Sequence, residues 1–320
     1  MDQTLVTVEN VSVDFAVRGA FGRKKRVHAV SGVSLSIPRG KTFGLVGESG
    51  CGKTTLANAM LGLVPVSSGA VRFEGRAITG VPAAEKRLIR RDMQMIFQDP
   101  FSSLNPRFDV LQIVSEPLLI RGGFTRDEMT ARSLELLDLV GPPESSLHRH
   151  PSDFSGGQRQ RIGIARALAL NPKFLVCDEP VSALDVSVHA QIMNLLMDLQ
   201  KELSITYLFI SHNLAVVRDI CDSVAVMYLG KVVETGRTQT IFDDPLHPYT
   251  RSLLSAVLDV DADSGKRRVV LEGDVPSPIN LPSGCRFHTR CPCAGESCDT
   301  REHELLKAGE DHYVSCRHFL

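Results

Sequence analysis

The 320-residue sequence has no hydrophobic run long enough to cross a membrane. The charge-free stretch around the apolar centre Tyr207–Ile210 extends only from Leu203 to Val217, whereas a membrane-spanning helix needs about 20 apolar residues. The N-terminus also lacks the basic segment and apolar run of a signal peptide, because Asp2 and Glu9 occupy those places. We therefore expect a cytosolic chain, whose role at a membrane would depend on a partner.

An excess of charge of one sign is also absent. The 36 Lys and Arg residues against 37 Asp and Glu residues leave a net charge of −1, which argues against a protein that coats nucleic acid. We interpret the basic runs at 23–26 and 86–91 as solvated faces. The sequence has no internal repeat, and its 43% apolar and 23% charged residues are ordinary for a globular protein. A chain of this length is predicted to form about two domains.

Cysteine is scarce before residue 285 and concentrated after it. Five of the eight cysteines fall in the last part of the chain: Cys285, Cys291, Cys293, Cys298 and Cys316. In a reducing compartment such a cluster suggests metal binding before it suggests disulfides. The spacing leaves zinc and an iron–sulfur cluster both open, because the sequence has no C-x₂-C pair.

Hydrophobic patterning predicts a mixed α/β fold. Apolar and polar residues alternate at 5–8, 11–15 and 33–37, which is typical of antiparallel strands with one buried face. Continuous apolar runs at 43–46, 174–177, 207–210 and 224–229 suit central strands of a parallel sheet, covered on both faces.

Helical signals dominate between about Pro100 and Ala165. Thr125 and Glu128 have capping-box spacing before an apolar periodicity at 129–140, and a second helix is predicted at 158–170. We therefore predict a helical subdomain inserted into the α/β core. After Leu258 the composition shifts to Asp, Ser, Gly, Pro and Cys, which marks a boundary.

A glycine-rich segment follows the first apolar run. Gly47–Thr54 fits G-x-x-x-x-G-K-[ST], and it lies between the strand Thr42–Val46 and the helix-compatible Leu56–Leu61. Its glycines let successive N–H groups turn toward a phosphate, and the helix presents its positive end. Lys53 would bridge the β- and γ-phosphates, and Thr54 would ligate Mg²⁺. The alternative, a structural turn that happens to hold a lysine, does not explain why the motif and both flanking elements agree.

Two adjacent carboxylates end another buried strand. Asp178 and Glu179 follow Phe174–Cys177 directly. Acids at the carboxyl end of a central strand are costly without a positive partner, and ligands of α/β sheets bind at those ends. We interpret Asp178 as a partner of hydrated Mg²⁺ and Glu179 as the group that orients or deprotonates the attacking water. The alternative is a pair of surface loop acids.

The segment Ser155–Gln158 opens the second predicted helix. Ser155 and Gln158 have capping-box spacing, which is a purely structural interpretation. Gly156 and Gly157 would each cost up to about 1 kcal/mol relative to alanine in a first helical turn. We therefore expect another group to approach this backbone closely, and the free N–H groups predict a second anion site.

These motifs form an ordered set along the chain: Gly47–Thr54, Gln98, Ser155–Gln158, Phe174–Glu179, Ser182–Asp185 and His212. The set resembles the ATP-binding subunit of an ATP-binding-cassette (ABC) transporter over about residues 5–255. The resemblance implies an α/β fold, with a P-loop NTPase core of the ABC ATPase type and an antiparallel β subdomain. It implies a nucleotide-binding domain at 1–258, with the helical subdomain at about 100–165, and a small Cys-containing region at 259–320.

The resemblance also implies roles for individual residues. Catalysis would involve Glu179, His212, Lys53 and Gln98, of which Gln98 matches the glutamine loop that senses Mg²⁺ and His212 matches the switch histidine that contacts the γ-phosphate. Magnesium would be held by Thr54, Gln98 and Asp178. The implied nucleotide-binding residues are Gly47, Glu48, Ser49, Gly50, Cys51, Gly52, Lys53, Thr54, Thr55, Gln98, Ser155, Gly156, Gly157, Gln158, Asp178, Asp185 and Phe21. Asp185 matches the loop that communicates across the dimer, and Phe21 is the aromatic residue nearest to where the family stacks adenine.

Two longer segments narrow the resemblance. Phe154–Leu168 and His247–Leu254 resemble the oligopeptide and dipeptide importer branch, specifically its second ATPase subunit. This branch implies a heterodimer with a paralogous ATPase, in which Ser155 and the glycines beside it close over the γ-phosphate held by the other subunit. It also implies two transmembrane permeases and an extracytoplasmic solute-binding protein, no nucleic-acid partner, and a peripheral position at the cytoplasmic face of the inner or plasma membrane.

The same branch suggests what the cysteines hold. In this family the pattern carries a [4Fe–4S] cluster, so Cys285, Cys291, Cys298 and Cys316 are the implied ligands and Cys293 is an extra residue. The resemblance thus favours iron–sulfur over zinc.

We predict an ATPase that powers peptide import, with ATP, Mg²⁺ and the iron–sulfur cluster as cofactors. Related importers carry nickel, glutathione or other solutes on similar ATPases, so the sequence does not name the solute. A soluble ABC ATPase that acts on DNA or ribosomes is the alternative from another class. Such proteins tend to carry two cassettes or long coiled-coil insertions, and this sequence has one cassette and no such insertion.

Overall fold

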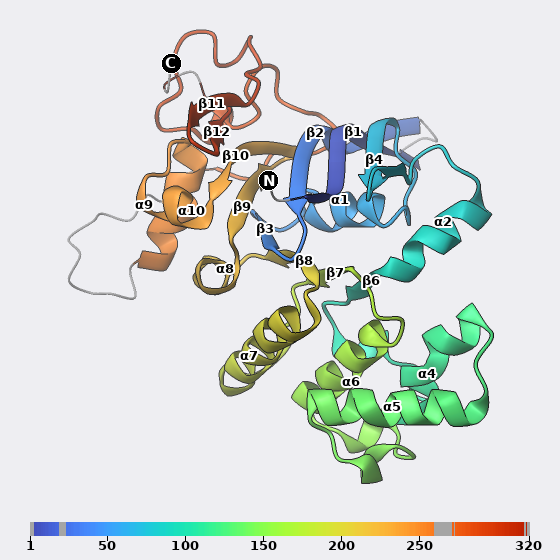
Figure 1. Ribbon diagram of the computed structural model, residues 1–320. Helices are drawn as coiled ribbons and strands as arrows, with labels where there is room; N and C mark the ends of the chain where they lie inside the picture. The colour runs from blue at the N-terminus through green and yellow to red at the C-terminus, as the bar shows by residue number, and fades with distance from the viewer. Residues whose placement is uncertain (1–2, 19–23, 259–270, 272, 317, 319–320) are drawn as a thin grey trace. The chain divides into compact units, whose positions relative to one another are not determined.

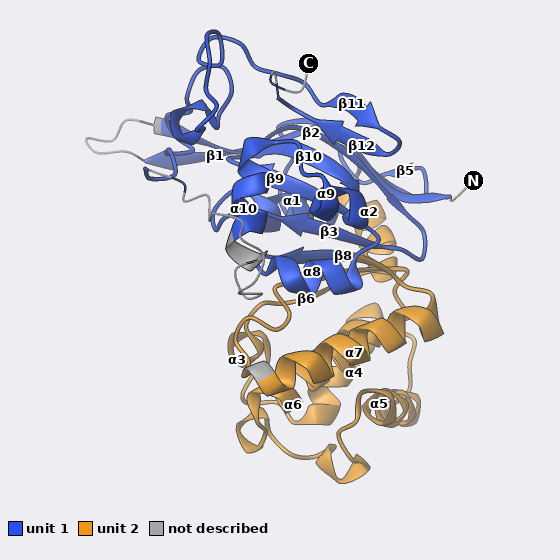
Figure 2. Cartoon of the chain, turned by 90° about the vertical axis from the view of Figure 1, so that its left-hand side faces the viewer, with its two compact units in different colours: residues 1–81, 209–320 blue, residues 82–208 orange. Residues whose placement is uncertain are grey.

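The computed structural model describes residues 3–18, 24–258, 271, 273–316 and 318. The chain divides into two compact units, which are coloured separately in Figure 2: residues 1–81 with 209–320, and residues 82–208. The boundary between the units falls inside strand β8 (Thr206–Ser211).

Strands and helices both occur throughout the chain (Figure 1). The other strands are β1 (Thr4–Arg18), β2 (Lys24–Pro38), β3 (Thr42–Val46), β4 (Ser68–Phe73), β5 (Arg76–Ala77), β6 (Met93–Ile96), β7 (Phe174–Asp178), β9 (Ser223–Tyr228), β10 (Lys231–Arg237), β11 (Leu306–Gly309) and β12 (His312–Val314). The α-helices are α1 (Lys53–Met60), α2 (Ala83–Ile89), α3 (Pro100–Ser103), α4 (Val110–Arg121), α5 (Arg126–Val140), α6 (Gly156–Leu168), α7 (Val186–Leu203), α8 (Leu214–Ile220), α9 (Thr238–Asp243) and α10 (Pro248–Leu258). Short 3₁₀ helices lie at Arg90–Asp92, Glu144–Ser146, Pro151–Asp153 and His288–Arg290.

The first unit contains an antiparallel sheet in the order β2-β1-β4-β5. Strand β1 pairs with β2 along almost its whole length, from Thr4 opposite Pro38 to Arg18 opposite Lys24. Most apolar residues of the alternating pattern are buried, including Val6, Val8 and Val11, whereas Phe15 and Leu35 are half-buried. The predicted antiparallel strands are therefore confirmed.

The same unit holds a second run of strands in the order β11-β12-β10-β9-β3. Strands β3 and β9 are parallel, with Phe43 opposite Ser223, and every residue of β3 is buried. The antiparallel strands β10, β12 and β11 follow β9. The C-terminal hairpin thus extends this sheet, since Glu234 of β10 pairs with Val314 of β12. Periodicity did not identify this hairpin, because its two strands are short.

The second unit contains the predicted helical region. Within residues 100–165, all of which are described, the elements are helical, and α4, α5 and α6 pack on one another (Figure 1). The capping box at the start of α5 is confirmed: the Thr125 hydroxyl accepts from the Glu128 N–H at 3.2 Å, and the Glu128 carboxylate accepts from the Thr125 N–H at 2.7 Å. Strands β6 and β7 of this unit pair in parallel.

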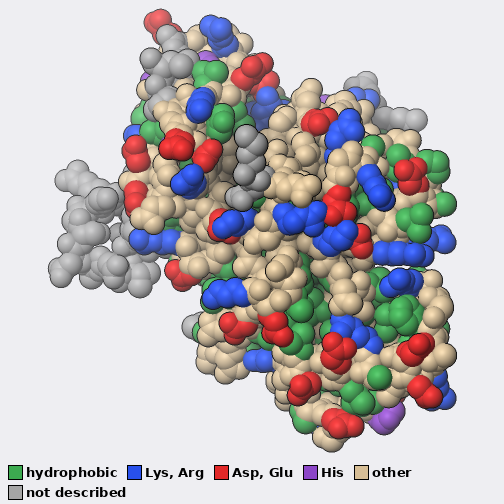
Figure 3. Space-filling view, in the orientation of Figure 1, with side chains coloured by type: hydrophobic (Ala, Val, Ile, Leu, Met, Phe, Trp, Pro, Cys, Tyr) green, Lys and Arg blue, Asp and Glu red, His purple; other side chains and the backbone are tan. Residues whose placement is uncertain are grey.

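Charged side chains of both signs are intermixed on the face shown in Figure 3. This pattern agrees with the near-zero net charge. In the described part of the chain, no helix combines the length and the apolar character that a membrane span requires.

Candidate functional site

The glycine-rich loop lies in the predicted context, between a buried strand and a helix. Strand β3 ends at Val46, and α1 begins at Lys53. The Lys53 side chain is buried, and its ammonium group donates to the carbonyl oxygens of Gly47, at 2.8 Å, and Glu48, at 3.0 Å. The cation is therefore held against the loop itself. Thr54 is exposed and Thr55 half-buried at the start of the helix.

Two glycines of this loop lie against backbone of neighbouring strands. A Cβ atom on Gly47 would come within 2.1 Å of the Met227 carbonyl oxygen of β9. A Cβ atom on Gly52 would come within 2.2 Å of the Ala29 carbonyl oxygen of β2. Both glycines also have positive φ angles, of 147° and 107°. The loop is thus packed too closely for a side chain at either position.

The structure also gives the segment His247–Leu254 a role that the sequence did not. Tyr249, at the start of α10, is fully buried, and its hydroxyl accepts from the backbone N–H of Glu48 at 2.9 Å. His247 accepts from the Tyr249 N–H at 3.1 Å, and burial lowers the pKa of His247 to about 3. The backbone N–H groups of Leu246 and His247 in turn donate to the buried Glu234 carboxylate. Residues of this segment therefore hold the backbone of the glycine-rich loop through the hydrogen bond between Glu48 and Tyr249.

The two predicted acidic residues occupy different environments at the end of β7. Asp178 is 4% exposed, whereas Glu179 is half-buried and follows the last residue of the strand. Glu179 has a φ angle of 45°, in the left-handed region that a non-glycine residue rarely adopts. Its carboxylate accepts from the Gln98 side-chain amide at 2.8 Å. The structure thus brings together Gln98 and Glu179, which lie 81 residues apart.

The capping box at the start of α6 is also confirmed. The Ser155 hydroxyl accepts from the Gln158 N–H at 3.4 Å, and the Gln158 side chain accepts from the Ser155 N–H at 3.0 Å. The helix begins at Gly156, two residues earlier than the sequence predicted. Ser155 and Gln158 are exposed.

Packing within the chain explains at least one of the two glycines that follow Ser155. A Cβ atom on Gly157 would meet Cγ1 of Val188 at 2.4 Å, and one on Gly156 would meet Cδ2 of Leu184 at 3.1 Å. The predicted close approach therefore includes residues in and just before the first turn of α7. Asp185, which is exposed, occupies the N-cap position of that helix.

Of the predicted site residues His212 and Phe21, the structure describes only His212. His212 is exposed and directly follows β8, the strand next to β3 in the sheet order. Phe21, the candidate for adenine stacking, lies outside the described residues.

The four predicted cysteine ligands line one small cavity, of about 20 Å³. Cys298 is buried, and Cys285, Cys291 and Cys316 are half-buried. Burial raises the pKa of Cys285 and raises the pKa of Cys291 to about 11. Cys293 is exposed and does not line this cavity. Among the described residues, no group of three or more His, Cys, Asp or Glu side chains is arranged to hold a metal ion.

Known proteins and family models are similar to this chain in sequence. The family model for ABC transporters matches residues 30–182, and the model for the C-terminal region of oligopeptide/dipeptide transporters matches residues 233–298. The oligopeptide transport ATP-binding protein AppF of Bacillus subtilis is 48% identical over 98% of this chain and 97% of its own length. The chain belongs to the ATP-binding proteins of the oligopeptide and dipeptide class of ABC transporters.

Other members and relatives of this ABC family support the same assignment. The oligopeptide transport ATP-binding protein OppF of Escherichia coli is 47% identical over 98% of this chain and 96% of its own length. A dimeric structure of the ATP-binding cassette MJ0796 with ADP and phosphate aligns with a TM-score of 0.65 and 30% identity, covering 73% of this chain and 99% of that one. The predicted α/β fold of the ABC ATPase type is therefore confirmed, and the chain is an ABC-type ATPase.

Proposed function

We propose that this chain binds and hydrolyses ATP to drive import of di- and oligopeptides across the cytoplasmic membrane. The observation that carries the proposal is similarity to peptide-transport ATP-binding proteins over nearly the whole chain, including the C-terminal region. Two transmembrane permeases would carry the peptide, and an extracytoplasmic solute-binding protein would deliver it. The chain would sit on the permeases at the cytoplasmic face, as a peripheral subunit.

At the nucleotide, the loop 47–55 would hold the phosphates through its N–H groups, with Lys53 on the β- and γ-phosphates. Thr54, Gln98 and Asp178 would hold Mg²⁺, and their hydroxyl, amide and carboxylate oxygens are ligands that this hard cation prefers. When bound, Mg²⁺ neutralises charge that develops on the phosphates. Glu179 would orient or deprotonate the attacking water, and His212 would contact the γ-phosphate.

The second nucleotide-contacting surface would be the start of α6. Ser155, Gly156, Gly157 and Gln158 would close over the γ-phosphate held by another ATPase subunit, and Asp185 would communicate between the two subunits. The partner would be a paralogous ATPase in a heterodimer. The dimeric structure of the relative MJ0796 with ADP and phosphate supports the coarser proposal of a dimer of ATPase subunits.

The division of the chain at residue 258 also stays a proposal. A nucleotide-binding domain at 1–258, with helical subdomain at about 100–165, would be followed by the cysteine-containing region at 259–320. The hairpin β11–β12 of that region pairs with β10.

Peptide uptake tests the proposed function. We expect cells that lack this chain to lose uptake of radiolabelled di- and oligopeptides, and to regain it with the unsubstituted chain but not with Lys53→Ala. The two permeases should co-purify with both forms, because Lys53 is buried within its own loop. Unchanged peptide uptake together with lost uptake of nickel, glutathione or another solute would reassign the cargo. Co-purification with nucleic acid or ribosomes instead of permeases would reject a transport role.

We also propose that Cys285, Cys291, Cys298 and Cys316 hold a [4Fe–4S] cluster. Four thiol side chains around one cavity are the donor set of such a cluster. Zinc also takes thiolate donors, so the four cysteines alone do not choose between the two metals. The resemblance of the C-terminal region to that of oligopeptide/dipeptide transporters favours the cluster.

Elemental analysis distinguishes the two metals. The chain purified without oxygen is expected to contain iron and acid-labile sulfide in roughly equal amounts, about four of each per chain. Cys291→Ser should lower both, whereas Cys293→Ser, at the exposed extra cysteine, should not. Stoichiometric zinc without sulfide would contradict the cluster.

A further inference from the structure

An ion pair joins the glycine-rich loop to the cysteine-bearing segment. Arg290 donates to both carboxylate oxygens of Glu48, at 2.8 and 3.1 Å, across 242 residues of sequence. The Arg290 side chain is 7% exposed and that of Glu48 26% exposed. A buried guanidinium group requires such a partner, and the two-point contact fixes the carboxylate in direction as well as distance.

Every polar group of Glu48 is engaged. Its side chain accepts from Arg290, its N–H donates to Tyr249, and its carbonyl oxygen accepts from Lys53. A phosphate-binding loop works through the directions of its N–H groups. Because Glu48 is held at three points, the direction of the backbone on both sides of it is fixed.

The segment that carries Arg290 also contacts the supports of the loop. Phe287 packs edge-on against Tyr228 of β9, with ring centroids 5.2 Å apart, and lies 5.4 Å from the Tyr249 ring. Arg286 donates to the Leu229 carbonyl oxygen, and the next residue, Gly230, donates its N–H to the Cys51 carbonyl oxygen. All three side chains come from residues 285–291, between the first two predicted cysteine ligands.

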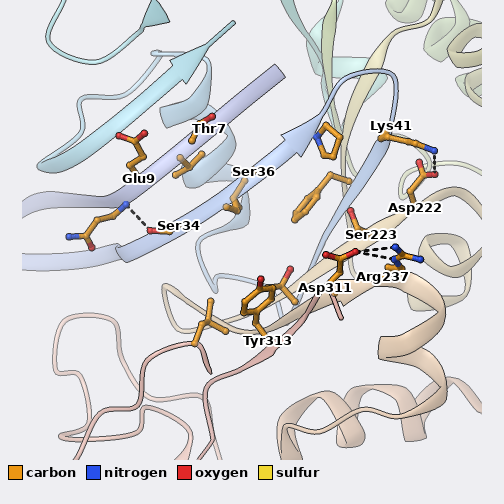
Figure 4. A pocket seen from close by; sticks show the side chains of 18 residues that line it. Thr7, Glu9, Ser34, Ser36, Lys41, Asp222, Ser223, Arg237, Asp311 and Tyr313 are labelled. Atoms are coloured by element: carbon orange, nitrogen blue, oxygen red, sulfur yellow. Dashed lines mark hydrogen bonds and ion pairs between the residues drawn. The ribbon is translucent and has the colours of Figure 1, made fainter. Parts of the chain in front are cut away.

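A comparable ion pair at the opposite end of β9, where Arg237 of β10 lies opposite Ser223, lacks these connections. Arg237 donates to one carboxylate oxygen of Asp311 through Nε and Nη2, at 3.2 and 3.1 Å, beside a groove lined by β1, β2, β10 and β12 (Figure 4). Its side chains are 63% and 62% exposed. It also ties the C-terminal region to the sheet, but among the described residues no hydrogen bond or ion pair joins Arg237 or Asp311 to the glycine-rich loop. Exposed ion pairs of this kind contribute little to the free energy of unfolding.

We propose that Arg290 is a positioning residue of the nucleotide site, which holds Glu48 and makes the affinity for nucleotide depend on the order of the cysteine-bearing segment. The proposal rests on the proposed function, in that the glycine-rich loop is taken to bind ATP. Because coupling between two sites is reciprocal, bound nucleotide also orders the segment 285–291.

The test compares full-length variants by nucleotide affinity and by turnover. In Arg290→Gln, a charge-assisted contact of Glu48 is lost, and the dissociation constant for a fluorescent ATP analogue is expected to rise about tenfold or more. The KM for ATP should rise similarly, while kcat at saturating ATP stays within about threefold, because ATP restores the loop. Arg290→Lys, which keeps the charge, should recover part of the affinity.

Two further variants separate positioning from stability. Arg237→Gln is the matched control and should bind the analogue like the unsubstituted chain. Glu48→Gln removes the same ion pair by a change in the glycine-rich loop and leaves the cysteine-bearing segment unaltered. The double variant Glu48→Gln/Arg290→Gln should bind the analogue no more weakly than the weaker-binding of the two single variants. Proteolysis between Cys285 and Cys291 should slow with the analogue in the unsubstituted chain, but not in Arg290→Gln.

The outcomes are distinct. If Arg290→Gln and Glu48→Gln lower the melting temperature but bind the analogue as tightly as the unsubstituted chain, the ion pair is only structural and this inference is overturned. If the unsubstituted chain itself binds no analogue, the proposed function fails and the inference fails with it.

Discussion

Glu179→Gln is expected to leave ATP binding intact and to lower hydrolysis by about 10²–10⁴-fold, the usual contribution of a general base. The amide has the shape of the carboxylate, but it cannot take a proton from water. It keeps an oxygen that can accept from Gln98, as Glu179 does at 2.8 Å, so the local arrangement should survive. ATP that is bound but not hydrolysed should also hold the proposed dimer with a second ATPase subunit closed.

Three measurements check this prediction. Phosphate release at saturating ATP gives the turnover, a fluorescent ATP analogue gives the affinity, and size-exclusion chromatography with ATP detects the trapped dimer. Glu202→Gln is the control, because Glu202 is an exposed acid near the end of α7. Hydrolysis at close to the normal rate in Glu179→Gln would show that another group activates the water.

Gly47→Ala is expected to destabilise the first unit by about 3 kcal/mol or more and to abolish measurable ATP binding. Two effects combine. A φ angle of 147° is unfavourable for alanine, and the added Cβ atom would lie 2.1 Å from the Met227 carbonyl oxygen. Backbone of β9 cannot move aside without breaking its pairing with β3. The glycine-rich loop must therefore move away from the sheet, and its N–H groups lose their direction.

Gly50→Ala is the matched control in the same loop. Gly50 also has a positive φ angle, of 77°, but a Cβ atom there would meet no other atom within 4 Å. The conformational strain alone costs about 1–2 kcal/mol. Thermal unfolding should therefore show a clearly larger loss for Gly47→Ala than for Gly50→Ala. Equal losses would mean that strain, and not the approach of β9, makes glycine necessary at residue 47.

Local patterns made much of this protein predictable. The capping boxes at Thr125 and Ser155 depend on residues three apart, and the strands at 43–46 and 174–177 depend on short apolar runs. The Gly47–Thr54 motif needs only its own residues and two flanking elements. Such features can be predicted from the sequence because the interactions that form them lie within one or two turns of chain.

Other features depend on which distant segments meet. Whether Gly157 faces a ligand or a side chain could not be read from its neighbours, since Val188 approaches it from another helix. The hairpin β11–β12 is too short to have a reliable periodicity, and pairing with β10 is what places it.

The class of chemistry can be predicted from the amino-acid sequence, because a lysine after glycines and a carboxylate pair after a buried strand carry their chemistry in the side chains themselves. What holds those groups in place is known only from the folded chain. Glu48 meets Arg290 from 242 residues away, and Tyr249 of α10 contacts the same loop residue. Such contacts are set by how strands pair and helices pack, and the residues involved carry no local sign of their partner.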